Sequence, residues 1–290
     1  MALRDGAAAI SPAFLAAEAV PLSSLFSLDG SIPQQPLELG SVSSFLHHSM
    51  ATSATKVGGD DSWSMRVAAS SGNLHSTETY LFLPAALTDE DAAGTTLHHY
   101  GAESHSLAAR ATYPAAAATD ALAAEGCFLV ALSSVWWRQA WKYGDRGWRY
   151  SELDCGHAIG ALRLAAAMHG WLATLVPGLP DAAIAAALGL DRYEDFVELE
   201  EEVPVVVLAV GPSPAGLRAA SAALRSMAEA AADAEWEGEA AALHGEDEHH
   251  DFDSSPVIAS VIAATALSAD AAASRYDTSH RQRPSISSLV

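Results

Sequence analysis

The feature that most constrains the fold of this chain is an irregular alternation of strand-like and helix-like runs through its middle. Residues 79–83, 127–132 and 204–210 are short runs rich in β-branched, aromatic or continuously apolar residues, as in buried strands. Residues 152–169 and 181–188 instead place apolar residues at helical spacing, and a glycine follows each run. Because these runs do not follow a regular strand–helix rhythm, the sequence predicts an α+β fold rather than a doubly wound sheet.

The same patterns predict one domain with a segment on either side. Residues 1–40 alternate small apolar stretches with Pro and Ser, which predicts a poorly ordered extension. Residues 41–215 carry the strand and helix patterns, including a hairpin formed by residues 95–109. Residues 216–290 are an alanine-rich helical and acidic tail.

Composition excludes several classes of function. The chain has 15 basic and 36 acidic residues and a formal charge of -21, so neither nucleic acid nor an anionic lipid surface is an expected partner. No apolar run approaches the length of a membrane helix. Two cysteines, Cys127 and Cys155, cannot build a disulfide framework, which favours a cytoplasmic protein. Residues 1–27 are rich in Ala and Ser with one arginine, so import into an organelle stays open.

A cluster of aromatic residues marks a first candidate site. Residues 136–150 read WWRQAWKYGDRGWRY and contain four tryptophans and the adjacent pair Lys142 and Tyr143. An apolar environment of indole rings would lower the pKa of Lys142 from its solution value of about 10.4 toward neutrality, and such a lysine can act as a base. The alternative is an amphipathic segment whose tryptophans fill the core while Lys142 and the arginines reach water.

A second candidate site is the segment RVAASSGNLHSTETY, residues 66–80. Small hydroxyl residues, Gly72 and Asn73 lie there between two strand-like runs. Such a loop brings backbone N–H groups and short side chains close to a planar ligand with polar edges, and glycine permits the approach. The same residues are also typical of an ordinary turn.

Taken together, the two segments resemble the FMN-dependent nitroreductase family, within it the branch of azoline dehydrogenases that make thiazoles and oxazoles in modified peptides. The motifs of that branch are similar to four segments here, which follow in the same order: residues 69–80, 97–100, 141–146 and 154–157. The resemblance covers residues 45–211. It implies a nitroreductase-like fold for residues 41–215, with a mixed, mainly antiparallel sheet flanked by helices.

The resemblance also implies a function and a set of site residues. It implies an FMN-dependent oxidoreductase that transfers hydride between flavin and a small organic or peptide-derived substrate, as a homodimer or paired with a related half. Lys142 would remove a proton beside the heteroatom, and Tyr143 would orient the substrate. The residues implied to bind FMN are Arg66, Ser70, Ser71, Gly72 and Asn73.

The chain departs from the family pattern in ways that leave two alternatives open. Ala69 and Ser76 stand where the family usually has proline, and no arginine occurs between Arg4 and Arg66 to hold the flavin phosphate. Longer members of the branch also carry a second, related half. The first alternative is therefore a non-catalytic scaffold or partner-binding module, and the second is a half-enzyme that gains its flavin site only by dimerising.

Other polar residues carry less weight. Asp154 and His157 share a helical face and could pair, although a core histidine satisfied by its neighbours is the simpler interpretation. The acidic, histidine-rich segment 244–251 could bind a divalent metal, but its irregular spacing is more typical of a solvated loop. The sequence therefore predicts no metal site.

Overall fold

The computed structural model describes residues 2–3, 20–26, 31–89, 91–114, 116–192, 195, 202–237 and 256–268. The helices are α1 (Leu39–His47), α2 (Ala117–Ala124), α3 (Trp137–Tyr143), α4 (Gly147–Met168), α5 (Asp181–Leu188), α6 (Pro214–Glu229) and α7 (Pro256–Thr265). The strands are β1 (Ala2–Leu3), β2 (Thr52–Gly58), β3 (Asp61–Arg66), β4 (Thr77–Pro84), β5 (Thr95–Gly101), β6 (Ser106–Tyr113), β7 (Phe128–Ser134), β8 (Leu172–Leu175), β9 (Val203–Gly211) and β10 (Glu235–Trp236).

One mixed sheet forms the centre of the molecule. Its strands follow the order β1-β6-β5-β4-β7-β9-β8, and β10 also pairs with β6. The short β1 runs parallel to β6, and the other neighbours are antiparallel. The predicted α+β fold with a mainly antiparallel sheet is confirmed.

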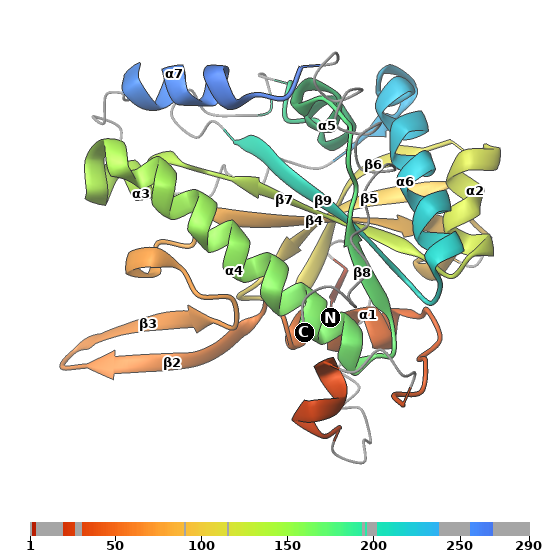
Figure 1. Cartoon of the computed structure of the whole chain (residues 1–290), viewed down its shortest axis with the longest axis horizontal. Coiled ribbons are helices and arrows are strands. Elements are labelled where there is room, and N and C mark those ends of the chain that lie inside the picture. The colour runs from red at the N-terminus through yellow and green to blue at the C-terminus, as the bar shows by residue number, and fades with distance from the viewer. Residues whose placement is uncertain are drawn as a thin grey trace, which may run out of the picture.

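Helices cover both faces of this sheet, which explains why β4 and β7 are buried along their whole length. Successive residues of a strand point to opposite faces. Leu81 and Leu83 pack in the core cluster that contains residues of α1 and α4, whereas Tyr80 and Phe82 pack in the cluster that contains residues of α5 and α6. Figure 1 shows the long helix α4 crossing the sheet, with α2 and α6 grouped at a different part of it.

Strands β2 and β3 form a separate two-stranded sheet. This hairpin extends away from the body in Figure 1, and most residues of β2 are exposed. A two-stranded hairpin has little stability of its own in water. Its last residue, Arg66, leads directly into the loop before β4.

The tryptophan-rich segment folds as two helices separated by a sharp turn. Helix α3 ends at Gly144, which has a φ of 60°, and α4 begins at Gly147. A Cβ on Gly147 would lie 2.4 Å from the backbone nitrogen of Ala140, so only glycine lets the two helices approach this closely. The predicted start of the long helix at residue 152 was therefore five residues too late.

The core of the domain includes contacts from residues before the predicted boundary at position 41. Gln35 donates its backbone N–H to the carbonyl of His169 at 2.9 Å and accepts a hydrogen bond from the Trp171 indole at 2.8 Å, so residues before position 41 also contact the core. The division at residues 40 and 215 stays a prediction.

Among the described residues, no helix combines the length and the apolar character needed to cross a bilayer.

Candidate active site

The loop between β3 and β4 has an unusual backbone. Gly72, Asn73 and His75 have φ values of 65°, 62° and 52°. Glycine adopts this left-handed region freely and asparagine tolerates it, but histidine does so at a cost in free energy. The loop therefore contains three residues in the left-handed region, two of which are not glycine, and its surroundings must hold this backbone conformation.

The side chains of this loop are hydrogen-bonded within the chain. The hydroxyl groups of Ser70 and Ser71 donate to the carboxylate of Asp154 at 3.1 and 2.8 Å. The Asn73 amide donates to the carbonyl of Ser64 at 2.8 Å. The residues implied to contact flavin thus lie together, but the hydroxyl hydrogens of Ser70 and Ser71 and one amide hydrogen of Asn73 already have acceptors.

Lys142 and Tyr143 lie directly against this loop. A Cβ on Gly72 would be 2.5 Å from the Tyr143 hydroxyl oxygen and 3.1 Å from Lys142 Nζ. The fold therefore brings the two sequence motifs to one place. The Tyr143 hydroxyl lies where a side chain at position 72 would begin, so the pair packs directly against the loop backbone.

Lys142 itself is exposed, so in the single chain the second of the two interpretations holds, in which tryptophans fill the core and the lysine reaches water. Trp136 is buried and packs with residues of α3 and α7, whereas Trp141 points outward and is 46% exposed. The tryptophans fill the interface between α3 and α7 rather than enclosing the amine. The Tyr143 ring instead packs on Tyr150, with ring centroids 4.6 Å apart.

Arg66 is positioned by the loop as well. Its Nη1 donates to the backbone carbonyl of Thr77 at 2.9 Å. This bond ties the end of β3 to the start of β4 across the loop. The implied role of Arg66 in binding FMN remains a prediction, and it would have to be compatible with this bond.

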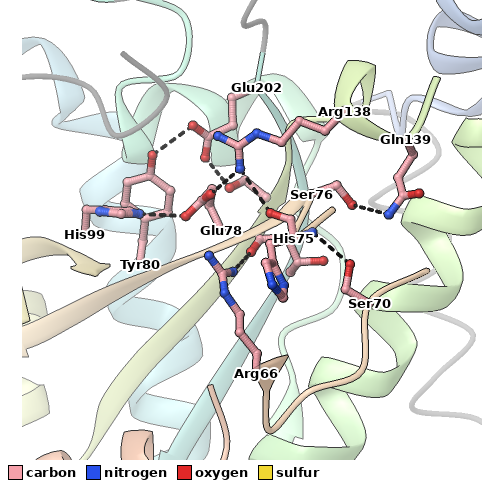
Figure 2. Close-up of polar contacts among 12 residues, drawn as sticks. Arg66, Ser70, His75, Ser76, Glu78, Tyr80, His99, Arg138, Gln139 and Glu202 are labelled. Atoms are coloured by element: carbon pink, nitrogen blue, oxygen red, sulfur yellow. Dashed lines mark hydrogen bonds and ion pairs between the residues drawn. The ribbon is translucent and has the colours of Figure 1, made fainter. Parts of the chain in front are cut away.

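A buried ionic network lies beside the loop, and Figure 2 shows its members converging from β4, β5, α3 and the residue before β9. Arg138 Nη1 donates to Glu78 Oε1 at 2.8 Å and to the carbonyl of His75 at 3.0 Å, and His99 Nε2 lies 2.9 Å from Glu78 Oε2. Burial acts to raise the pKa of Glu78, but the hydrogen bond from His99 and the charges of Arg138 and Arg66 lower it well below its usual range. Glu78 is therefore a buried carboxylate held in its charged form.

A second buried acid adjoins this network. Tyr80 donates its hydroxyl to Glu202, and so does Ser133. Burial first, and the nearby charge of Glu78 second, raise the pKa of Glu202. The pKa values of these two neighbouring buried carboxyl groups are therefore shifted in opposite directions.

Four polar residues of the site were missed by sequence reasoning as partners of the loop: Glu78, Arg138, Gln139 and Asp154. Gln139 is fully buried, and its Nε2 donates to the carbonyl of Ser71 at 3.0 Å and to Asp154 Oδ2 at 2.8 Å. The available signal was a charged residue within a run that reads as a strand, as Glu78 does at the start of β4. Asp154 bonds to the loop and not to His157, which is exposed and bonds to the carbonyl of Leu153.

An open groove adjoins the residues just before the loop. It has a volume of about 660 Å³, and its walls come from α4 and from the residues just before the loop. Ala68, Ala69, Gly156 and Gly160 are among the lining residues. Small side chains leave room there for a flat ring system.

The remaining sequence candidates do not join the site. Cys127 and Cys155 are buried free thiols, and burial raises their pKa values to about 11 and about 12. No group of three or more metal-ligating side chains occurs within the described part of the chain. The segment 244–251 lies outside the described residues.

These observations fit the ring of a flavin better than its phosphate. The groove, the left-handed loop backbone and the small residues of α4 suit a flat, mostly apolar ring. Arg66 is the loop's own arginine, and it is committed to a carbonyl. A dianionic phosphate would need further cations from elsewhere.

Comparison with known proteins gives a consistent assignment. The sequence model of the nitroreductase family matches residues 34–212. No curated protein sequence matches the chain. Similar solved structures include an Anabaena variabilis protein assigned as a nitroreductase, at 24% identity and a TM-score of 0.45, over 59% of this chain and 34% of that one. This chain thus spans about a third of the Anabaena protein.

Two further structures are similar over more of their length. One comes from the E. coli microcin synthetase McbBCD complex with truncated pro-MccB17 bound, at 19% identity and a TM-score of 0.47, over 72% of this chain and 78% of that one. The other is a Ralstonia eutropha protein assigned as a nitroreductase, at 19% identity and a TM-score of 0.47, over 67% and 83%.

Proposed function

The chain belongs to the nitroreductase family, and we propose that it is an FMN-dependent oxidoreductase of the azoline dehydrogenase type. The observation that carries the proposal is the contact of Lys142 and Tyr143 with the left-handed loop at Gly72. A lysine amine, in its neutral form, and a phenol beside a backbone turn at glycine provide a base and an orienting group next to a ligand surface.

In the proposed reaction, an azoline ring in a peptide is oxidised to the aromatic azole. Lys142 Nζ takes the proton from the carbon beside the heteroatom, and the electron pair of that bond becomes part of the new double bond. Tyr143, whose hydroxyl lies beside the same loop as Lys142 Nζ, would orient the substrate. Bound FMN would supply the acceptor for the hydride that leaves the adjacent carbon. Residues 70–73 would contact its ring edge, and Arg66 would lie toward its phosphate.

The proposal is tested by adding FMN to the purified protein. We expect saturable binding, seen as a shift of the visible flavin absorbance and a change of flavin fluorescence on titration. Free FMN in the same buffer is the control for the spectrum. A protein that is folded by circular dichroism, is colourless and leaves both signals unchanged would overturn the enzyme proposal and favour the scaffold alternative.

A second copy of the chain is the proposed partner, seated on α4. The exposed side of this helix carries Leu153, which is 50% exposed, and Leu164, which is 39% exposed. Between them, Cβ atoms on Gly156 and Gly160 would meet nothing within 4 Å. Small residues on a helix face allow a second helix to approach closely, and the exposed leucines supply apolar area to bury. This face also lines the groove beside the loop.

The pairing is tested by the charge-introducing variant Leu164→Arg. We expect the wild type to sediment as a dimer and the variant as a monomer, because an arginine at the centre of an apolar interface would be buried without a partner. Leu175→Arg is the matched control, since Leu175 is 48% exposed on β8, away from α4's outer face. A wild type that is monomeric in sedimentation velocity, with and without FMN, would contradict the pairing.

A further inference from the structure

Asp154 is a buried carboxylate at the centre of the loop's hydrogen bonds. It is 4% exposed. It accepts from the Ser70 hydroxyl, from both the backbone N–H and the hydroxyl of Ser71, and from Gln139 Nε2, at 2.8 to 3.1 Å. Among the described residues, Asp154 forms no ion pair. Neutral donors alone hold this carboxylate out of water.

Such an arrangement costs free energy unless the hydrogen bonds are all made, because a buried carboxylate loses its hydration. Its donors come from two separate elements, the loop and α3, while Asp154 itself lies on α4. A residue that only packed α4 against the sheet would not need to be charged. The carboxylate therefore serves to fix the loop and α3 relative to each other.

The loop needs such fixing because of its backbone. Gly72, Asn73 and His75 all have positive φ values, and non-glycine residues in this region persist only where their surroundings hold them. Asp154 holds the residues just before Gly72. The backbone N–H of His75, which donates to the Ser70 hydroxyl oxygen at 2.9 Å, passes the same constraint to the far side of the turn.

Gln139 extends the constraint to the Lys–Tyr pair. It lies three and four residues before Lys142 and Tyr143, so the three side chains share one face of α3. Through this face Gln139 contacts Ser71 and Asp154 while Lys142 and Tyr143 contact Gly72. We propose that Asp154, acting with Gln139, is the positioning residue that holds the loop of residues 70–73 against Lys142 and Tyr143.

The same bonds set the polarity that the loop presents to a ligand. Because the Ser70 and Ser71 hydroxyl hydrogens point to a carboxylate, the outward side of Ser71 Oγ offers lone pairs. This edge, with a negative charge behind it, suits an N–H or O–H donor of the ligand and repels a phosphate. This assignment of ligand polarity rests on the proposed flavin site. In that site the edge of the flavin ring, and not the phosphate, would contact the serines.

The test of positioning uses flavin-free protein and the variant Asp154→Asn. The backbone N–H groups of Ser71, Asn73 and His75 each donate within this network, so they report on it directly. In the variant we expect their hydrogen exchange, measured by NMR, to accelerate about tenfold or more, because Ser71 N–H loses its charged acceptor and the bonds of Asn73 and His75 to Ser70 depend on the Ser70 side chain that Asp154 holds. Exchange in β7 should be unchanged. Asp120→Asn, an exposed aspartate on α2, is the matched control.

Unchanged exchange at these three amides would overturn the proposal. If β7 also loses protection, Ser71→Ala replaces the first variant, since it removes one hydroxyl donor and leaves Asp154 in place; it should accelerate the same amides. Combining the two substitutions should add little to either alone, because both act on one network.

FMN and riboflavin titrations of the same variant separate the two proposals. We expect Asp154→Asn to weaken both ligands by a similar factor of about tenfold, because the serines meet the ring edge that the two share. A larger loss for FMN than for riboflavin would contradict the polarity assigned to the loop. If neither ligand binds the wild type while the three amides still accelerate in the variant, the flavin proposal fails and the positioning role stands.

Discussion

Replacing Lys142 with alanine is expected to slow the reduction of bound FMN by a thiazoline-containing peptide by about 10²- to 10⁴-fold, the usual loss when a general base is removed. The amine lies 3.1 Å from where a Cβ on Gly72 would be, so it is placed beside the loop that the ligand would contact. The rate is measured anaerobically as the loss of flavin absorbance after mixing, so that no second electron acceptor is required.

Two control variants distinguish the role of Lys142 as a base from the effect of its positive charge. Lys142→Arg keeps a cation at the site but cannot give up its proton at neutral pH, so it should be nearly as slow as the alanine variant. Lys56→Ala removes the only other lysine of the sequence, from the exposed strand β2, and should react like the wild type. A Lys142→Ala variant that binds FMN and reacts at the wild-type rate would remove the lysine from the mechanism.

Replacing Arg138 with methionine is expected to lower the free energy of unfolding at pH 7 by about 3–5 kcal/mol, the usual loss when one partner of a buried ion pair is removed. Arg138 is the cation closest to the buried Glu78 carboxylate, at 2.8 Å, and it also binds the His75 carbonyl. The loss is measured from urea unfolding. Arg218→Met, on the exposed side of α6, is the control and should change stability little.

The loss of unfolding free energy in Arg138→Met should become smaller at acidic pH. Because the pKa of Glu78 is lowered in the folded protein, its charged form adds stability above the usual glutamate pKa, and this contribution is lost as the pH falls below it. The gap in unfolding free energy between wild type and Arg138→Met should therefore stay constant down to about pH 5 and narrow between about pH 5 and pH 3. The double variant with Glu78→Gln should recover part of the loss at pH 7. A gap that is the same at about pH 5 and pH 3 would contradict the assigned charge of Glu78.

The sequence predicted the fold well where the elements carry strong patterns. Helix α5 has the predicted bounds because Gly189, with a φ of 71°, ends it, and the buried strands match the apolar runs closely. The start of α4 was predicted too late because no side chain caps it. The helix instead continues from a 3₁₀ turn, and the tight packing of Gly147 on Ala140 depends on the tertiary structure.

The site was predicted only in part, for a physical reason. Short motifs pointed to Gly72, Lys142 and Tyr143, which the fold brings into contact. Their supporting residues were not identified because the bonds join positions far apart in the chain, such as Ser71 and Asp154. Of the two environments expected for Lys142, the one in which it reaches water holds for the single chain, because the tryptophans beside it in sequence turn toward α7 or toward solvent. The Lys142 amine can be shielded from water only when a ligand or a second copy of the chain covers it.

The central claim is that the loop at Gly72 and the Lys142–Tyr143 pair belong to one flavin site, and FMN titration of two glycine variants tests it most directly. Gly72 and Gly59 have nearly the same φ, 65° and 66°, so alanine is similarly strained at each; a Cβ at Gly59 meets nothing within 4 Å, whereas one at Gly72 meets Tyr143 and Lys142. We predict that Gly59→Ala binds FMN like the wild type and that Gly72→Ala binds it at least about tenfold more weakly. Equal binding by both variants would contradict the claim.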